Sequence, residues 1–394
     1  MAESIDRPAS PLRKPRKATY AAIDEDLLLE EETLGSYEAD RYYPVHIGEL
    51  FENRYQVIGK LGFGSQSTVW LCRDLVKHKY VTVKVYSTIT TQGAQEERVY
   101  ARLKSKVDLS ETGTIRDLLD IFELPGAKGK HVCIVHKVLG TTAERLAELF
   151  PGRRMLHPLV LLAADSLIVD LSQLHDVQPS NVLLVHDKEN DEFTKTFEQG
   201  ERSHPSLRRV DSRNGRHIYS SRALGIPENL ARYSLCDYGA AVFGQREYTH
   251  DAMPDLYRAP EIILRMPWNE KIDIWSLGLT LWTLYEGGPL FQDTKLGRNR
   301  SRTAHLARMI AVLGPPPDDL LQRGSCSKQF FDESGIFKGE EDIVPFSLED
   351  EMLSLKGKEK SLFLAFLRRT LQWRPEDRPS AAQLRNDPFL QQLQ

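Results

Sequence analysis

The sequence is poor in cysteine and carries no excess of charge of either sign. Its four cysteines lie far apart and form no CxxC pair; they are Cys72, Cys133, Cys236 and Cys326. This spacing excludes a thiolate zinc site and a disulfide framework, so we expect free thiols in a reducing compartment. The 52 basic and 56 acidic residues leave a net charge of −4. That near balance gives no overall case for binding nucleic acid or an anionic membrane.

Long hydrophobic runs and an amino-terminal leader are lacking as well. The apolar run Leu159–Ala164 stops at Asp165, far short of the ~18–20 apolar residues that a membrane span requires. Glu3 and Asp6 argue against a signal or transit peptide. We therefore expect no membrane partner and no direct nucleic-acid partner.

Residues 1–46 contain blocks of opposite charge and little apolar material. A basic stretch at 13–17 is followed by acidic clusters at 24–26 and 30–32. Such a composition predicts a disordered amino-terminal tail over residues 1–46. The basic stretch is also compatible with a nuclear-import signal, although a solvated tail is the preferred interpretation.

Residues 47–139 have the pattern of a small β-rich unit. Stretches rich in Val, Tyr and Trp alternate with Gly or charged turns, which predicts successive antiparallel strands. We place strands at 55–60, 67–73 and 80–86, a helix at 95–103, and two further strands at 114–123 and 131–138.

The chain from residue 140 to 392 is mainly helical in pattern. Helices are predicted at 142–149, 159–174, 272–285, 305–313 and 358–371. Residues 186–230 are charged and weakly patterned, so we expect an insertion, mostly loop, between short strands at 181–185 and 233–236. The predicted fold class is therefore α+β, with a small β-rich unit followed by a larger helical one.

A glycine-rich loop, LGFGSQSTV at 61–69, joins the first two predicted strands. Gly62 and Gly64 allow the backbone to approach a phosphate closely, and free N–H groups there can bind it. Ser67 stands where a third glycine is usual. An ordinary hairpin turn therefore explains the loop when it is taken alone.

A lysine inside an apolar strand is the second chemical signal. Lys84 lies twenty residues beyond Gly64, within the strand 81–85, and a lysine there needs an anionic partner. Glu96 lies on the apolar face of the following predicted helix. A Lys84–Glu96 pair beside the glycine loop would direct the ammonium group at nucleotide phosphates, and a surface ion pair is the simpler alternative.

Oxygen ligands follow in the helical half. Asp176 and Asn181 are five residues apart, and Asp237 ends a predicted strand before Tyr238 and Gly239. Asn181 and Asp237 carry hard oxygen donors that suit Mg²⁺, which retains water and phosphate ligands. Asp176 could orient a hydroxyl group and accept its proton late in phosphoryl transfer.

These motifs, in this order, resemble those of the eukaryotic protein kinases over roughly residues 47–392. The resemblance extends to A-P-E at 259–261 and to Arg378 within RPEDRPSAAQL. Within the kinases the chain looks most like the SR-protein kinases, which phosphorylate Ser/Arg-rich splicing factors. The strings HVCIVHKVLG and HLARMIAVLGPPPDDLLQRG, Ser67 and the insertion carry this narrower likeness.

The resemblance implies a bilobal protein-kinase-like fold that uses ATP and Mg²⁺. The nucleotide-binding positions that it implies are Leu61, Gly62, Gly64, Ser67, Val69, Lys84, Lys137 and Leu139. The catalytic positions are Lys84, Glu96 and Asp176, with Asp176 as the base, and the metal ligands are Asn181 and Asp237. His136 takes the gatekeeper position, Glu261 and Arg378 form a structural ion pair, and Asp273 braces the catalytic loop.

The implied activity is that of a serine/threonine protein kinase, which transfers the γ-phosphoryl group of ATP to serine. The implied partners are Arg/Ser-rich splicing factors. We expect a monomer that works in the cytoplasm and the nucleus.

The segment before Asp176 departs from the family pattern. His175 precedes Asp176 by one position instead of two, about eight residues are missing, and Gln178 replaces a lysine. The missing residues remove up to ~26 Å of strand path, and one lost electrostatic contact can cost ~10²–10³ in rate. Three explanations stay open: an active kinase that tolerates the gap, a nucleotide-binding pseudokinase or scaffold, and an incomplete gene model.

Overall fold

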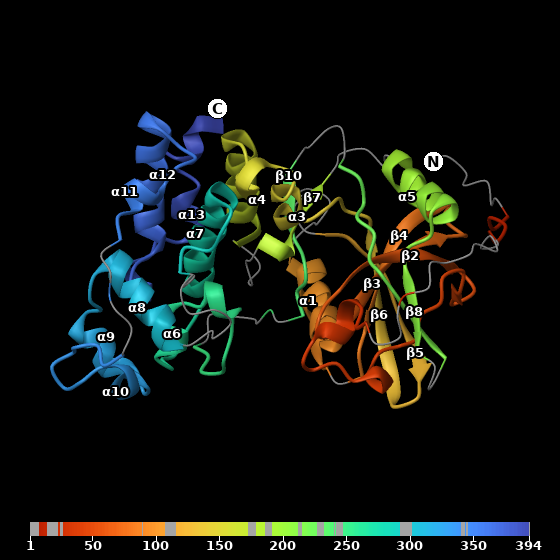
Figure 1. Cartoon of the computed structure of the whole chain (residues 1–394), viewed down its shortest axis with the longest axis horizontal. Helices are drawn as coiled ribbons and strands as arrows, with labels where there is room; N and C mark the ends of the chain where they lie inside the picture. The colour runs from red at the N-terminus through yellow and green to blue at the C-terminus, as the bar shows by residue number, and fades with distance from the viewer. Residues whose placement is uncertain are drawn as a thin grey trace. The chain divides into compact units, whose positions relative to one another are not determined.

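The computed structural model describes residues 8–13, 23, 27–88, 90–106, 116–171, 179–185, 191–211, 215–226, 232–239, 241, 247–291, 302–339, 343 and 346–393. Two compact units are formed within this part of the chain (Figure 1). The first unit draws on 1–141, 184–231 and 237–240, and the second on 142–183, 232–236 and 241–394. The division after Thr141 is close to the predicted boundary at 139, but the insertion belongs to the first unit rather than to the helical one.

A six-stranded antiparallel sheet forms the body of the first unit, in the order β1-β2-β3-β4-β6-β5. The strands are β1 Leu50–Phe51, β2 Tyr55–Phe63, β3 Ser67–Asp74, β4 Lys79–Tyr86, β5 Leu118–Gly126 and β6 Gly129–Lys137. Helix α1 spans Gln92–Lys106. The strands predicted at 55–60, 67–73, 80–86 and 131–138 are confirmed, and β5 begins at Leu118 rather than at 114.

Strand β4 shows how the alternation of side chains builds this sheet. Val81, Val83 and Val85 lie on one face and are buried in the core, where β-branched side chains pack well. Thr82 and Lys84 alternate to the other face, and both are buried as well. The central strand is therefore covered on its two faces, which places a lysine in a buried environment.

The amino-terminal segment differs from the predicted disordered tail over 1–46 where the structure describes it. Glu30–Thr33 and Ala39–Arg41 form short 3-10 helices, η1 and η2. Tyr42 and Val45 are buried against the first unit. Apolar side chains near the end of this segment thus belong to the hydrophobic core, which the charged composition of the segment did not indicate.

Ion pairs hold the acidic cluster of this segment. Glu31 pairs with Lys60 of β2, whose side chain is fully buried. Glu32 accepts hydrogen bonds from Arg209 of the insertion, one of them at 2.9 Å. The carboxylates expected to be solvated are therefore buried, because each has a cationic partner from a later part of the chain.

The insertion also differs from its prediction as mostly loop. It contains helix α5 at Asp191–Ser203 and a hairpin of β8 at Arg208–Asp211 and β9 at Arg216–Tyr219. In Figure 1, α5 lies beside the sheet of the first unit.

Two phenylalanines explain the position of α5. Phe193 and Phe197 are four residues apart, share one helix face and are buried in a cluster with Ile58 and Leu71. The backbone of Gly59 lies so close that an added Cβ would be 2.9 Å from Phe197 Cε1. A side chain at position 59 would push the helix away from β2.

The second unit is helical. Its helices are α3 Ala143–Ala147, α4 His157–Leu171, α6 Pro260–Ile263, α7 Lys271–Glu286, α8 Arg302–Leu313, α9 Asp318–Arg323, α10 Ser327–Phe330, α11 Leu348–Glu351, α12 Gly357–Thr370 and α13 Ala381–Leu384. Short 3-10 helices lie at Pro151–Arg153, Pro179–Asn181, Asp255–Tyr257, Pro375–Asp377 and Leu390–Leu393. The two short strands predicted at 181–185 and 233–236 are present as β7, Val182–Val185, and β10, Arg232–Leu235, and they pair with each other.

Helix α7 is the centre of the second unit and contacts both α4 and α12. At Gly278 it approaches α12 so closely that an added Cβ would overlap Thr370. The five helices predicted for this half are confirmed as α3, α4, α7, α8 and α12. Among the described residues, no helix has the length and apolar character needed to cross a membrane.

Candidate active site

Lys84 is held between two carboxylates within the first unit. Its Nζ lies 2.6 Å from Asp237 Oδ1 and 3.2 Å from Glu96 Oε2. Burial by itself would lower the pKa of Lys84, but the charges of Asp237 and Glu96 outweigh it and raise the pKa well above its usual value. The ammonium group is therefore permanently charged, and the predicted pair with Glu96 is present.

Glu96 is fixed by further contacts from the sheet. It is 1% exposed, and the hydroxyl of Tyr86 donates a hydrogen bond to Oε2. His136 Nε2 lies 3.7 Å from Oε1. Burial, with the nearby charges of Arg116 and Lys84, lowers the pKa of His136 well below its usual range, so the imidazole is neutral.

The glycine loop connects β2 and β3 next to this lysine. Apart from the adjoining chain neighbours, no atom of the described residues lies within 4 Å of where a Cβ would be at Gly62 or Gly64. Neither has a positive φ, so the fold itself does not require glycine at these positions. The space beside this backbone therefore suits the close approach of a ligand.

The flanks of the loop are fixed by the rest of the first unit. The hydroxyl of Tyr42 donates to the carbonyl of Ser65 at 2.7 Å, which ties the loop to the amino-terminal segment. Ser67 is buried, whereas Leu61 and Val69 are partly buried. The structure thus places all five predicted loop positions on one hairpin.

The predicted adenine-binding segment follows β6. The carbonyl of Lys137 accepts hydrogen bonds from Arg116 at 3.1 and 3.3 Å. Gly140 donates its backbone N–H to the carbonyl of Leu184 at 2.8 Å. The backbone N–H and carbonyl of Leu139 have no hydrogen-bond partner among the described residues, which suits a polar heterocycle.

Asp237 has an unusual backbone conformation for a residue that is not glycine. Its φ is 69°, in the left-handed region, which aspartate tolerates better than most residues. The N–H of Gly239 lies 3.4 Å from Oδ1. The side chain is 47% exposed although Oδ1 contacts Lys84, so the carboxylate is open to a further ligand.

The two residues after Asp237 anchor it. Tyr238 is fully buried, and its ring lies 5.4 Å from that of Tyr100 on α1. A Cβ at Gly239 would lie 3.0 Å from Gln92 Cβ. Packing on both sides of the chain therefore fixes the orientation of the Asp237 carboxylate.

The remaining predicted residues belong to the second unit. Asn181 is 8% exposed, and its carbonyl accepts the N–H of Cys236 at 2.7 Å. Glu261 and Arg378 form a fully buried ion pair at 2.6 Å, as the sequence predicts. Asp273 is buried in α7. Asp176, the predicted base, lies outside the described residues, as does the rest of 172–178.

The donor set fits a magnesium–nucleotide complex. Among the described residues there is no cluster of three or more His, Cys, Asp or Glu that would hold a metal ion by itself. Mg²⁺ does not need such a cage, because it keeps water and takes phosphate oxygens as ligands. On the first unit, Asp237 would supply a protein oxygen and Lys84 would bind phosphate oxygens directly. Asn181, on the second unit, is the other metal ligand that the kinase resemblance implies.

Three residues that stabilise this site were not predicted from the sequence. Tyr86 orients Glu96, Tyr42 holds the glycine loop, and Arg116 binds the hinge carbonyl. The position of Tyr86, two residues after Lys84 on the same face of the strand, was a usable signal. Nothing in the local sequence marks Tyr42 or Arg116, because their partners are 23 and 21 residues away.

Comparison with known proteins identifies the family. The protein kinase domain family matches residues 227–390. A protein of Aspergillus fumigatus named a serine/threonine protein kinase is 35% identical over 387 residues, which cover 97% of this chain and 95% of the relative.

Two relatives carry more specific names. The serine/threonine-protein kinase SRPK of Physarum polycephalum is 29% identical over 92% of this chain and 91% of its own length. Protein kinase dsk1 of Schizosaccharomyces pombe is 24% identical over 96% of this chain and 89% of its own length. With the catalytic constellation on the first unit, these full-length matches lead to one conclusion. The chain belongs to the eukaryotic protein kinases, as a serine/threonine kinase similar to the SR-protein kinases.

Proposed function

We propose that this kinase transfers the γ-phosphoryl group of ATP to serine residues of Arg/Ser-rich proteins, with Mg²⁺ as its cofactor. The observation that carries the proposal is the buried Lys84, charged and fixed between Glu96 and Asp237. A buried ammonium group held in this way is preorganised for phosphate, and preorganised charge is a major source of catalysis.

Each residue of the site has a part in this proposal. Lys84 binds phosphate oxygens, Glu96 holds Lys84 in place, and the free backbone groups of Leu139 bind the adenine edge. Asp237 and Asn181, the metal ligands that the kinase resemblance implies, would hold Mg²⁺, which would neutralise phosphate charge. Asp176 orients the serine hydroxyl and accepts its proton as the new O–P bond forms.

Nucleotide binding is tested by a thermal-shift titration with ATP in the presence and absence of Mg²⁺. We expect magnesium-dependent stabilisation that Lys84→Met or Asp237→Ala weakens. Lys130→Met is the matched control, because Lys130 lies on the same sheet but its side chain is 72% exposed and pairs with Glu123 on the surface. No stabilisation at millimolar ATP would refute nucleotide binding.

The substrate class rests on similarity to the SR-protein kinases, including the Physarum protein named SRPK. A peptide array tests it with serines flanked by arginine and matched peptides in which alanine replaces arginine. We expect phosphorylation of the arginine-flanked serines. Equal labelling of the two sets would reject the Arg/Ser-rich assignment while leaving the kinase activity intact.

An active enzyme is favoured over a pseudokinase or scaffold. The Aspergillus relative that matches 97% of the chain is named a kinase, and the phosphate-binding groups on the first unit are in place. The shortened segment before Asp176 then affects the rate of phosphoryl transfer rather than its occurrence.

We also propose that the kinase acts as a monomer in the cytoplasm and the nucleus. The basic stretch 13–17 supports nuclear entry. Fluorescence microscopy of a tagged chain in which alanines replace Lys14, Arg16 and Lys17 should show less protein in the nucleus. An unchanged distribution would contradict this role, and light scattering tests the monomer.

A further inference from the structure

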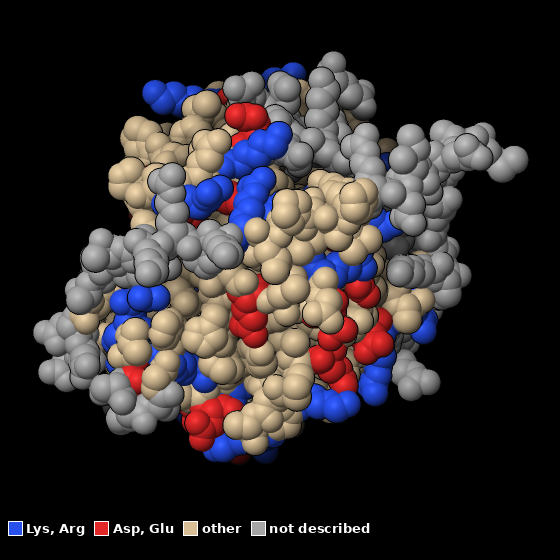
Figure 2. Space-filling view, turned by 90° about the vertical axis from the view of Figure 1, so that its right-hand side faces the viewer, with Lys and Arg blue, Asp and Glu red and all other residues tan. Residues whose placement is uncertain are grey.

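A cationic cavity of about 530 Å³ lies in the first unit, away from Lys84 and the glycine loop. Five of its lining residues are Lys or Arg and two are Asp or Glu: Arg13, Arg73, Lys79, Lys195 and Arg202 against Asp74 and Glu198. Figure 2 faces the side on which α5 lies in Figure 1, and Lys and Arg side chains gather above the centre of that face.

Both carboxylates of the cavity are already bound. Asp74 accepts two hydrogen bonds from Arg54, at 2.7 and 3.0 Å. Glu198 pairs with Arg13 and accepts the hydroxyl of Tyr80 at 2.5 Å. They therefore offer little compensation to the other cations of the cavity.

Three of those cations have no carboxylate partner among the described residues. Arg73 only reaches the carbonyl of Pro11 and the side chain of Gln56, at 3.4 and 3.5 Å. Lys79 and Arg202 form no ion pair in the same part of the chain. Burial and the nearby charge of Arg13 lower the pKa of Arg73, and the charge of Glu198 offsets this lowering only in part.

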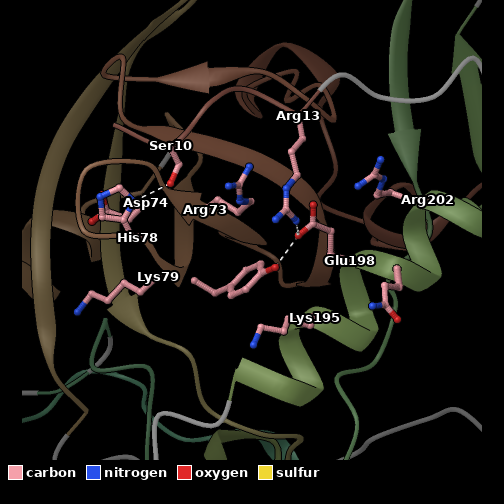
Figure 3. A pocket seen from close by; sticks show the side chains of 11 residues that line it. Ser10, Arg13, Arg73, Asp74, His78, Lys79, Lys195, Glu198 and Arg202 are labelled. Carbon is pink, nitrogen blue, oxygen red and sulfur yellow. Dashed lines mark hydrogen bonds and ion pairs between the residues drawn. The ribbon is translucent and has the colours of Figure 1, made fainter. Parts of the chain in front are cut away.

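Ser10 presents a hydroxyl group to this cavity. Its Oγ lies 2.6 Å from His78 Nδ1 (Figure 3), and its backbone N–H donates to the carbonyl of Leu75 at 2.8 Å. The described residues 8–13 form no helix or strand; Ser10 is half-buried and the other five are exposed. A modifying enzyme can therefore approach Ser10 from both flanks of this irregular segment.

We propose that Ser10 is a phosphorylation site and that its phosphate binds in the cationic cavity. Ser10 is followed by Pro11 and then by Arg13, so a kinase that recognises serine before proline is the fitting enzyme. Ser10 Oγ forms a bond to the γ-phosphorus of ATP, the bond to the bridging oxygen breaks, ADP leaves, and the hydroxyl proton passes to the modifying kinase.

A phosphoserine adds about −1.5 to −2 charge and three acceptor oxygens. Arg73, Lys79 and Arg202 would provide the donors that match it. The two guanidinium groups bind phosphate in a fork geometry, and the ammonium group of Lys79 binds it as a point charge. The modified segment would be held to the sheet at Ser10 and to α5 through the Arg13–Glu198 pair. Phosphorylation would thus fasten the amino-terminal segment to the insertion.

The test compares the full chain carrying phosphoserine at position 10, incorporated genetically, with the unmodified chain. Hydrogen exchange of the backbone amides in residues 8–13 should slow about tenfold, the effect of one charge-assisted hydrogen bond. Arg73→Met should abolish most of this slowing, and Lys77→Met should preserve it, because Lys77 is exposed on the turn that follows β3 and does not line the cavity. If Arg73→Met fails to fold, Arg202→Met serves instead.

Equal exchange in the modified and unmodified chains would overturn the proposal. Slowing that survives both Arg73→Met and Arg202→Met would overturn it as well, because the phosphate would then act elsewhere. A titration of the unmodified chain with inorganic phosphate separates the two phosphate sources. We expect inorganic phosphate below about 10 mM to leave the hydrogen exchange of residues 8–13 unchanged. A slowing that saturates at micromolar phosphate would show that the cavity binds a free ligand rather than the phosphate of Ser10.

Discussion

At the scale of single residues, the site depends on how one carboxylate is oriented. Glu96 is buried between the ammonium of Lys84, the hydroxyl of Tyr86 and the neutral imidazole of His136. Of these three groups only Lys84 carries a compensating charge. The hydrogen bond from Tyr86 therefore helps to set the orientation of the Lys84–Glu96 pair. Tyr86 is therefore a positioning residue, which acts through Glu96.

Tyr86→Phe should lower kcat about tenfold. It removes a hydrogen bond to a charged group, which contributes about 1.5–3 kcal/mol, and we expect part of that free energy to be lost from the transition state. Steady-state kinetics with ATP as the varied substrate measure the change. Tyr80→Phe, on the same strand at the cationic cavity, is the matched control. An unchanged kcat in Tyr86→Phe would show that Lys84 alone orients Glu96.

His305 gives the second unit a dependence on pH. Burial lowers its pKa to about 4, and its Nε2 lies 3.3 Å from the carbonyl of Arg258. The unfolded chain binds a proton at this residue below about pH 6.5, whereas the folded chain does not until about pH 4. Stability contributed by the neutral imidazole is thus present above pH 6.5 and is lost as the pH falls.

His305→Gln should reduce the slope of unfolding free energy against pH between pH 6.5 and 4. The reduction is at most about 1.4 kcal/mol per pH unit, the value for one proton. Urea unfolding at several pH values measures it. His204→Gln, an exposed histidine, should leave the slope unchanged, and equal slopes in the wild type and His305→Gln would contradict the account.

At the scale of elements, the periodic strands and helices could be predicted, and the segments that cover the sheet could not. The valines of β4 alternate clearly, but the apolar residues of α5 stand among many charged ones. Glu31 and Glu32 looked like solvated residues because their partners, Lys60 and Arg209, lie 29 and 177 positions away. Local composition does not contain such pairings, and only the folded chain brings them together.

The Glu31–Lys60 pair should be a strong tether between η1 and β2. Glu31→Gln should destabilise the first unit by about 3 kcal/mol, because it removes the nearer carboxylate partner of a buried ammonium and leaves Glu30, whose Oε2 lies 3.9 Å from Lys60 Nζ. Lys60 also donates to the carbonyl of Tyr219 at 3.1 Å, which keeps the loss at the lower end of the range for buried pairs. Denaturant unfolding measures it.

The double variant Glu31→Gln/Lys60→Met should recover much of that stability, since no unpaired charge remains. Glu123→Gln, which breaks an exposed pair with Lys130, should change stability by less than about 1 kcal/mol. A double variant as unstable as Glu31→Gln would show that shape, and not charge, holds η1 in place.

The segment between α4 and Asn181 is the element that sequence reasoning marked as short, and it lies outside the described residues. We predict that it limits turnover far more than nucleotide binding, because the matched phosphate-binding residue Lys84 and the matched metal ligand Asp237 lie elsewhere. A base displaced by ~1 Å can cost about 10²-fold in rate. Inserting eight family-like residues after His175 should raise kcat strongly.

The same insertion should leave ATP affinity nearly unchanged, and Asp176→Ala in the extended chain should abolish the gain. Quench-flow kinetics and a nucleotide-binding titration separate the two quantities. A native chain that already turns over at ~1–100 s⁻¹, the range of typical kinases, would show that the short segment is harmless.

At the scale of the whole molecule, the residues of the kinase motifs are distributed over two units of one chain. The first unit carries Lys84, Glu96 and Asp237, and the second carries Asn181 and the buried Glu261–Arg378 pair. Most of these residues could be predicted, because motif order and spacing are properties of the sequence. Their distances and the extra groups that fix them required the folded chain.

The measurement that tests the central claim most directly is transfer of ³²P from γ-labelled ATP to a peptide of alternating arginine and serine. We predict magnesium-dependent labelling of serine that falls at least ~10²-fold in Lys84→Met and in Asp237→Ala, while Lys130→Met retains it. Labelling of the native chain no greater than that of Lys84→Met, in a protein that still binds ATP, would contradict the account and identify a pseudokinase.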